Sequence, residues 1–138
     1  MSDDTRGEQL QQGITLSPFG RLLGFELVDW SPEHVRIKMP FRDDLTTMGN
    51  MVHGGATAAL ADTAATAVAW AGVDPDNRPS RGTTISLDVR YVAAGLGQDL
   101  TAEARATKRG RTICFCEVAI RNEADDLVAD ARAVYKLG

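Results

Sequence analysis

The residues best suited to chemistry are a His-Gly-Gly segment, His53 to Gly55, and a lone aspartate, Asp62, in the apolar stretch that follows it. Glycines at a helix start leave backbone N–H groups open to a ligand, and the helix dipole adds partial positive charge there. This arrangement suits an anion or a developing oxyanion. A carboxylate in an apolar helix is costly unless it is paired or hydrogen-bonded, and one reason to keep it is work as a general base or nucleophile. Both features also have a plain structural explanation: tight packing for the glycines, and a hydrogen bond to a neighbour such as Thr66 for Asp62.

The spacing of these groups predicts a site shared by two subunits. Gly54 and Asp62 are eight positions apart, which is about 12 Å along a helix axis. One substrate carbonyl cannot touch both groups on the same helix. Two antiparallel helices side by side would bring the N-terminus of each near the middle of the other. We therefore expect the active site of a homo-oligomer to lie across a two-fold dimer interface.

The element that must position these groups is one long helix over residues 51–70. Alanine, the strongest helix former, dominates this run. Gly72 lies where a left-handed cap is expected, and Asp74-Pro75 stops the helix. Asp62 is the only charge in the run, whereas a surface helix would carry a polar stripe. We therefore expect a helix buried on most sides, and it is too short and too rich in threonine for a membrane span.

These residues resemble the hotdog-fold acyl-CoA thioesterases. The His-Gly-Gly segment, followed by a Leu-Ala-Asp-Thr run with the Asp nine residues after the His, is similar to the phenylacetyl-CoA thioesterase-like branch of the 4-hydroxybenzoyl-CoA thioesterase superfamily. The resemblance implies hydrolysis of an aromatic or medium-chain acyl-CoA to the free acid and CoA. It implies that Gly54 or Gly55 polarises the thioester carbonyl and that Asp62 of the partner acts as base or nucleophile, with that choice left open. His53 then shapes the start of the helix.

Further candidates for substrate binding follow from the resemblance. The family often places an Asn six residues before the His, where this chain has Thr47. An Asn occurs instead at Asn50, where it can equally be a turn residue. Thr84 falls where the family places a Ser or Thr near the attacking water, although strand parity assigns it to the polar face. Thr63 is among the matched residues and completes this group.

Three basic residues, Lys108, Arg109 and Arg111, cluster at a predicted turn. Arginine and lysine suit phosphates, and coenzyme A carries several. Arg109 and Arg111 are therefore candidate contacts to the substrate phosphates, and the alternative is a solvated hairpin tip.

Composition limits the remaining function classes. The 138 residues suffice for one domain with a core, and a net charge of −4 argues against a nucleic-acid partner. Cys114 and Cys116 make neither a CxxC pair nor a metal set, so we expect them to be buried small hydrophobes. With only His34 and His53 besides, we expect no metal and no other cofactor. The N-terminal region has no apolar run of the kind that forms a signal peptide. We therefore expect a cytoplasmic protein without membrane contact.

The N-terminal region divides into two parts. Residues 1–13 are polar, and we expect a flexible arm there, followed by a single domain over residues 14–138. Ser17-Pro18 predicts the start of a short helix that ends at Gly24.

The remaining segments predict strands. They lie at 25–30, 35–41, 83–92, 100–107, 112–121 and 128–136. Apolar and polar residues alternate in 35–41, 83–92, 100–107 and 128–136, whereas 112–121 is largely apolar on both faces, as expected of a central strand or one at an interface. Short turns between the last three favour an antiparallel meander. The expected fold class is α+β, with an antiparallel curved sheet wrapped around one long central helix, which is the hotdog fold that the resemblance implies. Pairing of subunits would cover the exposed sheet edges, and the resemblance favours a dimer of dimers.

Two other functions stay open. A hotdog dehydratase or hydratase would need a His beside a carboxylate for proton transfer, and only His53 is a candidate. A non-catalytic acyl-CoA binding module would keep the pocket without needing Asp62. Three observations distinguish these functions. Release of free thiol indicates hydrolysis, a change in enoyl-thioester absorbance indicates hydration, and binding without turnover indicates a binding module.

Overall fold

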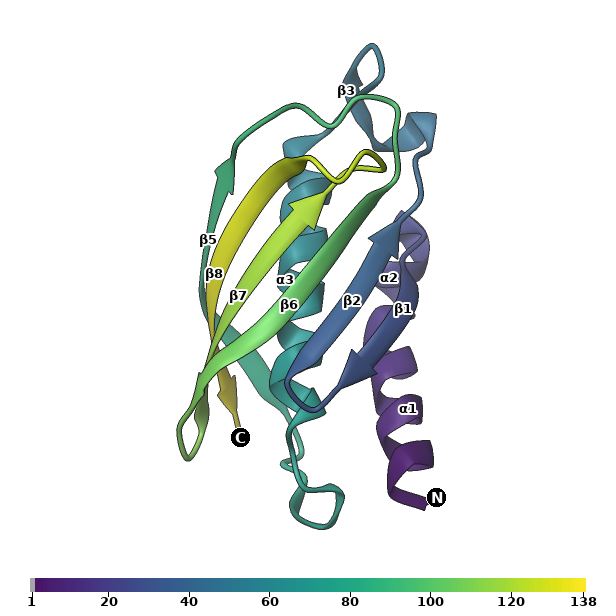
Figure 1. The fold of residues 1–138 in the computed structure, drawn as a ribbon. Coiled ribbons are helices and arrows are strands. Elements are labelled where there is room, and N and C mark those ends of the chain that lie inside the picture. Colours follow the sequence, from purple (N-terminus) through teal and green to yellow (C-terminus); the bar gives the residue numbers. More distant parts are fainter. Residues whose placement is uncertain (1) are drawn as a thin grey trace.

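The computed structural model describes residues 2–138, with the side chains of residues 5–138. One antiparallel sheet, in the order β1-β2-β6-β7-β8-β5, curves around helix α3 (Figure 1). Its strands are β1 (Glu26–Ser31), β2 (His34–Met39), β5 (Gly82–Tyr91), β6 (Leu100–Arg109), β7 (Ile113–Arg121) and β8 (Leu127–Leu137). The other elements are α1 (Ser2–Thr15), α2 (Pro18–Leu23), η1 (Asp43–Leu45), β3 (Thr46–Met48), β4 (Met51–Val52), α3 (Gly54–Ala71) and η2 (Pro75–Asn77). The predicted α+β hotdog fold is confirmed.

Helix α3 is the centre of the core because small side chains let the sheet approach it closely. Its residues Leu60, Ala61 and Ala64 have no exposed surface, and inward-facing alanines of the sheet such as Ala102 and Ala104 have none either. The interior is packed to the density of organic crystals in such contacts. The prediction of a helix buried on most sides is confirmed.

Both ends of α3 differ in detail from the prediction. The helix begins at Gly54 instead of residue 51, because Met51–Val52 pairs with β3 as the short strand β4. At the other end Gly72 has φ −92°, so the expected left-handed cap is wrong. A Cβ at Gly72 would lie 2.3 Å from the guanidinium carbon of Arg109. Glycine is needed there for the close approach of that side chain.

The structure also differs from the expected flexible arm. Residues Ser2–Thr15 form α1, which lies against α3 and the β1 edge of the sheet (Figure 1); Met1 is outside the described residues. The Gln11 side chain is fully buried, and its Nε2 donates to the carbonyl of Ala67 at 2.8 Å. The polar composition of residues 1–13 did not indicate this packing, because the residue that fixes α1 to α3, Gln11, is itself polar. We propose that α1 belongs to the same single domain.

The predicted short helix is confirmed as α2. The Ser17 hydroxyl accepts from the Gly20 N–H at 3.3 Å, and Gly24 ends the helix at φ +79° in the left-handed region that glycine favours.

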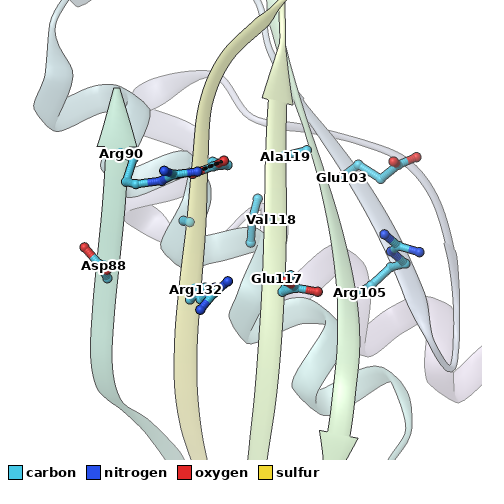
Figure 2. Close-up of a pocket in the computed structure, with 10 residues that line it drawn as sticks. Asp88, Arg90, Glu103, Arg105, Glu117, Val118, Ala119 and Arg132 are labelled. Atoms are coloured by element: carbon cyan, nitrogen blue, oxygen red, sulfur yellow. Dashed lines mark hydrogen bonds and ion pairs between the residues drawn. The ribbon is translucent and has the colours of Figure 1, made fainter. Parts of the chain in front are cut away.

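The outer face of the sheet, away from α3, carries a shallow groove of about 410 Å³ (Figure 2). Directly opposed residues on β5, β8, β7 and β6 alternate in sign there, through Asp88, Arg132, Glu117 and Arg105. Opposite charges across strands stabilise a sheet. On the next row Arg90 donates two hydrogen bonds to Asp130, which lowers the pKa of that carboxyl. This face is a solvated charged surface, on the opposite side of the sheet from Asp62.

Candidate active site

The N-terminus of α3 carries one free hydrogen-bond donor. His53 is the N-cap, and its Nδ1 accepts from the Gly55 N–H at 2.8 Å. The His53 carbonyl accepts from the N–H groups of Ala56 and Thr57. Among the described residues the Gly54 N–H has no acceptor. The sequence left Gly54 and Gly55 as alternatives, and the geometry favours Gly54 as the group open to a ligand.

His53 positions this donor. Its Nδ1 is an acceptor and therefore carries no proton, so the ring holds the first turn in place in the way that a capping side chain does. This agrees with its expected part in shaping the start of the helix.

Tyr91 is a further polar residue at this helix end that the sequence analysis did not single out. Its hydroxyl donates to the carbonyl of Gly54 at 2.7 Å, and its side chain is 54% exposed. In the sequence it was only the last apolar residue of an alternating strand. A contact between residues 37 positions apart leaves no local signal.

Asp62, in the middle of α3, is held by Thr84 of β5. The Thr84 hydroxyl donates to Asp62 Oδ1 at 2.7 Å in a part-buried setting. The parity argument had placed Thr84 on the polar face, and that expectation is wrong. A β-bulge between Thr84 and Ser86 inserts Ile85 as an extra residue, which reverses the facing of the residues before it.

A cleft of about 460 Å³ lies beside Asp62, between α1 and α3. Its lining comprises Leu10, Ile14, Ser17, Asp62, Thr63, Thr66, Trp70, Arg78, Pro79, Ser80 and Tyr135. Thr63, a predicted substrate contact, is thus in the wall. Trp70 Nε1 donates to the Tyr135 hydroxyl at 2.9 Å, and burial, with a smaller effect of the Asp62 charge, raises the pKa of Tyr135. Sequence reasoning missed this aromatic pair because its members are 65 residues apart.

Comparison with known proteins identifies the family. The sequence model of the thioesterase superfamily matches residues 49–129 of this chain. This range includes Gly54, Asp62 and Thr84. The chain belongs to the thioesterase superfamily. It is 31% identical over 123 residues to human acyl-coenzyme A thioesterase 13, and the alignment covers 87% of this chain and 85% of the human protein. It is 30% identical over 135 residues to the medium/long-chain acyl-CoA thioesterase YigI of Escherichia coli K12, with 88% and 86% covered.

A solved structure supports the same assignment. Zebrafish thioesterase superfamily member 2 is 30% identical, with a TM-score of 0.79 and 94% of each chain covered.

A further sequence relative comes from Deinococcus radiodurans. It is 34% identical over 105 residues, and the present chain spans 64% of the length of that relative. The prediction of an acyl-CoA thioesterase is confirmed by relatives that align over most of this chain.

Two of the predicted substrate contacts of this thioesterase lie in the β3–β4 hairpin. Thr47 and Asn50 are both exposed. Asn50 follows Gly49, which has φ +59°, and its carbonyl accepts from the Gly97 N–H at 2.9 Å. Asn50 is therefore a turn residue, and neither side chain has a hydrogen bond to Gly54 or Asp62.

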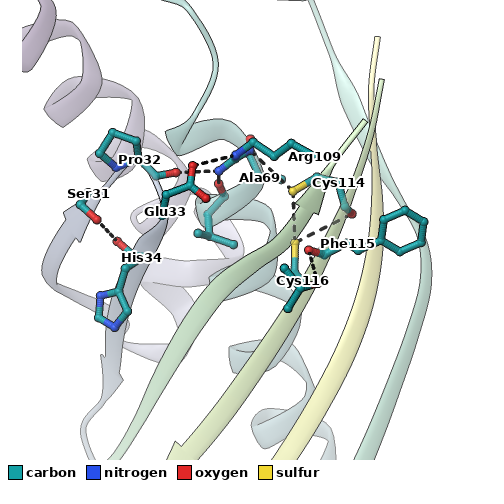
Figure 3. A network of polar contacts seen from close by, with 11 residues as sticks. Ser31, Pro32, Glu33, His34, Ala69, Arg109, Cys114, Phe115 and Cys116 are labelled. Carbon is teal, nitrogen blue, oxygen red and sulfur yellow. Dashed lines mark hydrogen bonds and ion pairs between the residues drawn. The ribbon is translucent and has the colours of Figure 1, made fainter. Parts of the chain in front are cut away.

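Arg109 caps the C-terminal end of α3, which is the opposite end from Gly54 (Figure 3). Its five N–H donors are directed at Glu33 Oε1, the carbonyls of Pro32, Val68 and Ala69, and Cys114 Sγ. All five donors of Arg109 are used within the chain, so a phosphate would have to displace one of these partners, and the contact of Arg109 to coenzyme A stays a prediction. Arg111 is an exposed residue of the same turn.

Arg109→Leu should therefore lower stability more than activity. The substitution leaves carbonyls at the end of α3 without donors, and we expect the free energy of unfolding to fall by about 2–3 kcal/mol. Arg111→Leu in the same turn is the matched control and should change it by no more than about 0.5 kcal/mol. Chemical denaturation of both variants measures the difference, and equal values would contradict the capping role.

Among the side chains that the structure describes, those of residues 5–138, no group of three or more His, Cys, Asp and Glu residues is placed to hold a metal ion. Over the same described residues, no helix has the length and apolar character needed to cross a membrane. Cys114 and Cys116 are both buried, as predicted.

Proposed function

We propose that this protein hydrolyses an acyl-CoA thioester to the free acid and CoA. The observation that carries the proposal is Asp62: a carboxylate in an apolar helix, oriented by Thr84, that opens onto a cleft of about 460 Å³. A cleft of this size is typical of small-molecule sites. Because Thr84 occupies one carboxylate oxygen, the other is available to the reaction.

In the proposed reaction each subunit of the dimer supplies one group to the shared site. The thioester carbonyl oxygen accepts a hydrogen bond from the Gly54 N–H of one subunit, and the helix dipole stabilises the oxyanion that develops there. Asp62 of the other subunit takes a proton from the attacking water or attacks the carbonyl carbon itself, giving a mixed anhydride that water then hydrolyses. In either route the C–S bond breaks and CoA leaves as its thiolate.

The free edge of β5 supports this dimer. Strand β5 pairs with β8 on one side only, and it runs antiparallel to α3, since Thr84 contacts Asp62 and Tyr91 contacts Gly54. Two copies of β5 that pair antiparallel about a point between these contacts would bring Thr84 of one subunit opposite Tyr91 of the other. Asp62 would then lie near Gly54 of the partner subunit.

Apolar exposure along β5 agrees with such pairing. Ile85 and Val92 are each 56% exposed, and exposed apolar residues on an unpaired strand edge favour association. The proposal includes a homo-oligomer built on this dimer, with a dimer of dimers as the form that the family resemblance favours, and a cytoplasmic location.

Ile85→Asp should convert the dimer to monomers and remove most of the hydrolytic activity. The new carboxylate would be buried without a partner in the subunit interface, which is strongly unfavourable. Light scattering coupled to size-exclusion chromatography gives the mass, and thiol release gives the activity. Val28→Asp, at an exposed position of β1 on the opposite sheet edge, is the control that should stay dimeric. A fully active dimer of Ile85→Asp would rule out this interface.

A panel of aromatic and linear acyl-CoAs with a thiol-detecting reagent tests the proposed reaction. Thiol release by the purified protein supports hydrolysis, and the best substrate identifies the acyl group, with a phenylacetyl-type group as the aromatic candidate. A change in enoyl-thioester absorbance without thiol would favour the hydratase alternative. Tight binding without turnover would favour an acyl-CoA binding module.

A further inference from the structure

A second cleft adjoins the cleft beside Asp62 and shares part of its wall. The second cleft, of about 280 Å³, lies between α1 and the segment that follows α3. Both clefts have Leu10, Trp70 and Arg78 in their walls. Trp70 therefore stands at the junction, with Asp62 on one side and Trp30 of the second cleft on the other.

The first cleft follows one face of α3. Asp62, Thr66 and Trp70 follow one another at intervals of four residues, so they share one helix face and span about 12 Å. Leu10 and Ile14, also four apart, face them from α1. The Gln11 amide holds α1 in this position through the Ala67 carbonyl. Leu10, Ile14 and Trp70 thus give the wall beyond Asp62 an apolar strip, which polar residues such as Thr66 and Arg78 border.

Trp70 is held in one orientation in the wall that the two clefts share. The indole is 9% exposed and Tyr135 is 5% exposed, and the 2.9 Å hydrogen bond between them fixes the ring orientation. Space for Tyr135 depends on Gly82, where a Cβ would come within 2.5 Å of the tyrosine ring. Residues from α3, β5 and β8 thus cooperate to hold the indole between the two clefts.

We infer that Trp70, held by Tyr135, limits the length of the acyl group, and that the substrate is a linear medium-chain acyl thioester. This inference rests on the proposed function. The carbonyl lies at Asp62, and an extended chain of the octanoyl or decanoyl kind runs along Thr66 and ends against the indole. A longer chain would have to pass the junction, which the Trp70–Tyr135 pair closes.

The test compares kcat/KM for butyryl-, octanoyl-, dodecanoyl- and palmitoyl-CoA. Wild type should prefer octanoyl-CoA. Trp70→Leu should raise the ratio of dodecanoyl- to octanoyl-CoA by about tenfold or more, because further methylenes gain apolar contact in the second cleft. Phe115→Leu, an equivalent change on the outer face of the sheet, should leave the profile unchanged. Thr66→Trp should shift the preference to butyryl-CoA, and it serves as the second variant if Trp70→Leu does not fold.

Binding of the same acyl-CoAs, measured by calorimetry in the Asp62→Asn background, separates this inference from the proposed reaction. A longer preferred chain in Trp70→Leu by binding supports the length limit even if no thioester is hydrolysed, which would refute the proposed function alone. An unchanged profile in both folded variants would overturn the length limit while hydrolysis stands. So would a wild type that favours phenylacetyl-CoA over every linear chain.

Discussion

Asp62→Asn should lower kcat for acyl-CoA hydrolysis by roughly a thousandfold or more, as the loss of a catalytic base or nucleophile does in other hydrolases. The amide has the shape of the carboxylate and still offers an oxygen to the Thr84 hydroxyl. It cannot take a proton from water at neutral pH or form an anhydride. The fold and the affinity for acyl-CoA should therefore be kept.

Thiol release measures the turnover, and calorimetric titration with the best acyl-CoA measures binding. Asp88→Asn is the matched control, since Asp88 is exposed on the outer face of β5, and it should retain wild-type kcat. Near-full activity of Asp62→Asn would show that the catalytic assignment is wrong. A single turnover of wild type in heavy-oxygen water tests the nucleophilic route, because label in Asp62 requires an anhydride whose aspartyl carbonyl is attacked by water, whereas the base route labels only the product acid.

The sequence was sufficient for the parts of the molecule that depend on local pattern. The Ala-rich run, the His-Gly-Gly start and the lone Asp62 lie within twenty residues of one another, and alternation of apolar and polar residues marked most of the strands. Residues brought together from distant segments were missed. The cleft combines Leu10 of α1 with Trp70 of α3 and Tyr135 of β8, and no spacing rule connects them.

Thr84 and Arg109 both show how tertiary structure changes what a local pattern indicates. One extra residue at Ile85 reversed the facing of Thr84, and period-two arguments assume that no bulge intervenes. Arg109 was expected to meet phosphate because it lies in a basic turn. Its donors are instead used by carbonyls of α3 and of the β1–β2 turn, which a sequence does not show.

Gly54→Pro should lower kcat about a hundredfold to a thousandfold, the usual effect of removing one oxyanion donor. Proline deletes the free N–H and is favoured at the first position of a helix. The preceding residue, His53, already has the extended backbone that proline requires (φ −62°, ψ 133°). Gly54→Ala is the control, because it keeps the N–H and its Cβ would meet Tyr91 at an ordinary 3.5 Å. If both variants lose the same activity, the N–H is not the donor.

Mixing the two inactive variants tests whether the site is shared. In a heterodimer of Asp62→Asn and Gly54→Pro subunits, one site has both substitutions and the other has an intact Gly54 from the first subunit and an intact Asp62 from the second. Such a heterodimer should regain roughly half of the wild-type activity, since a two-fold dimer has two equivalent sites. If Gly54 and Asp62 served the same substrate within one subunit, neither site would be complete and mixing would restore nothing. The recovery therefore measures directly what the eight-residue spacing implies.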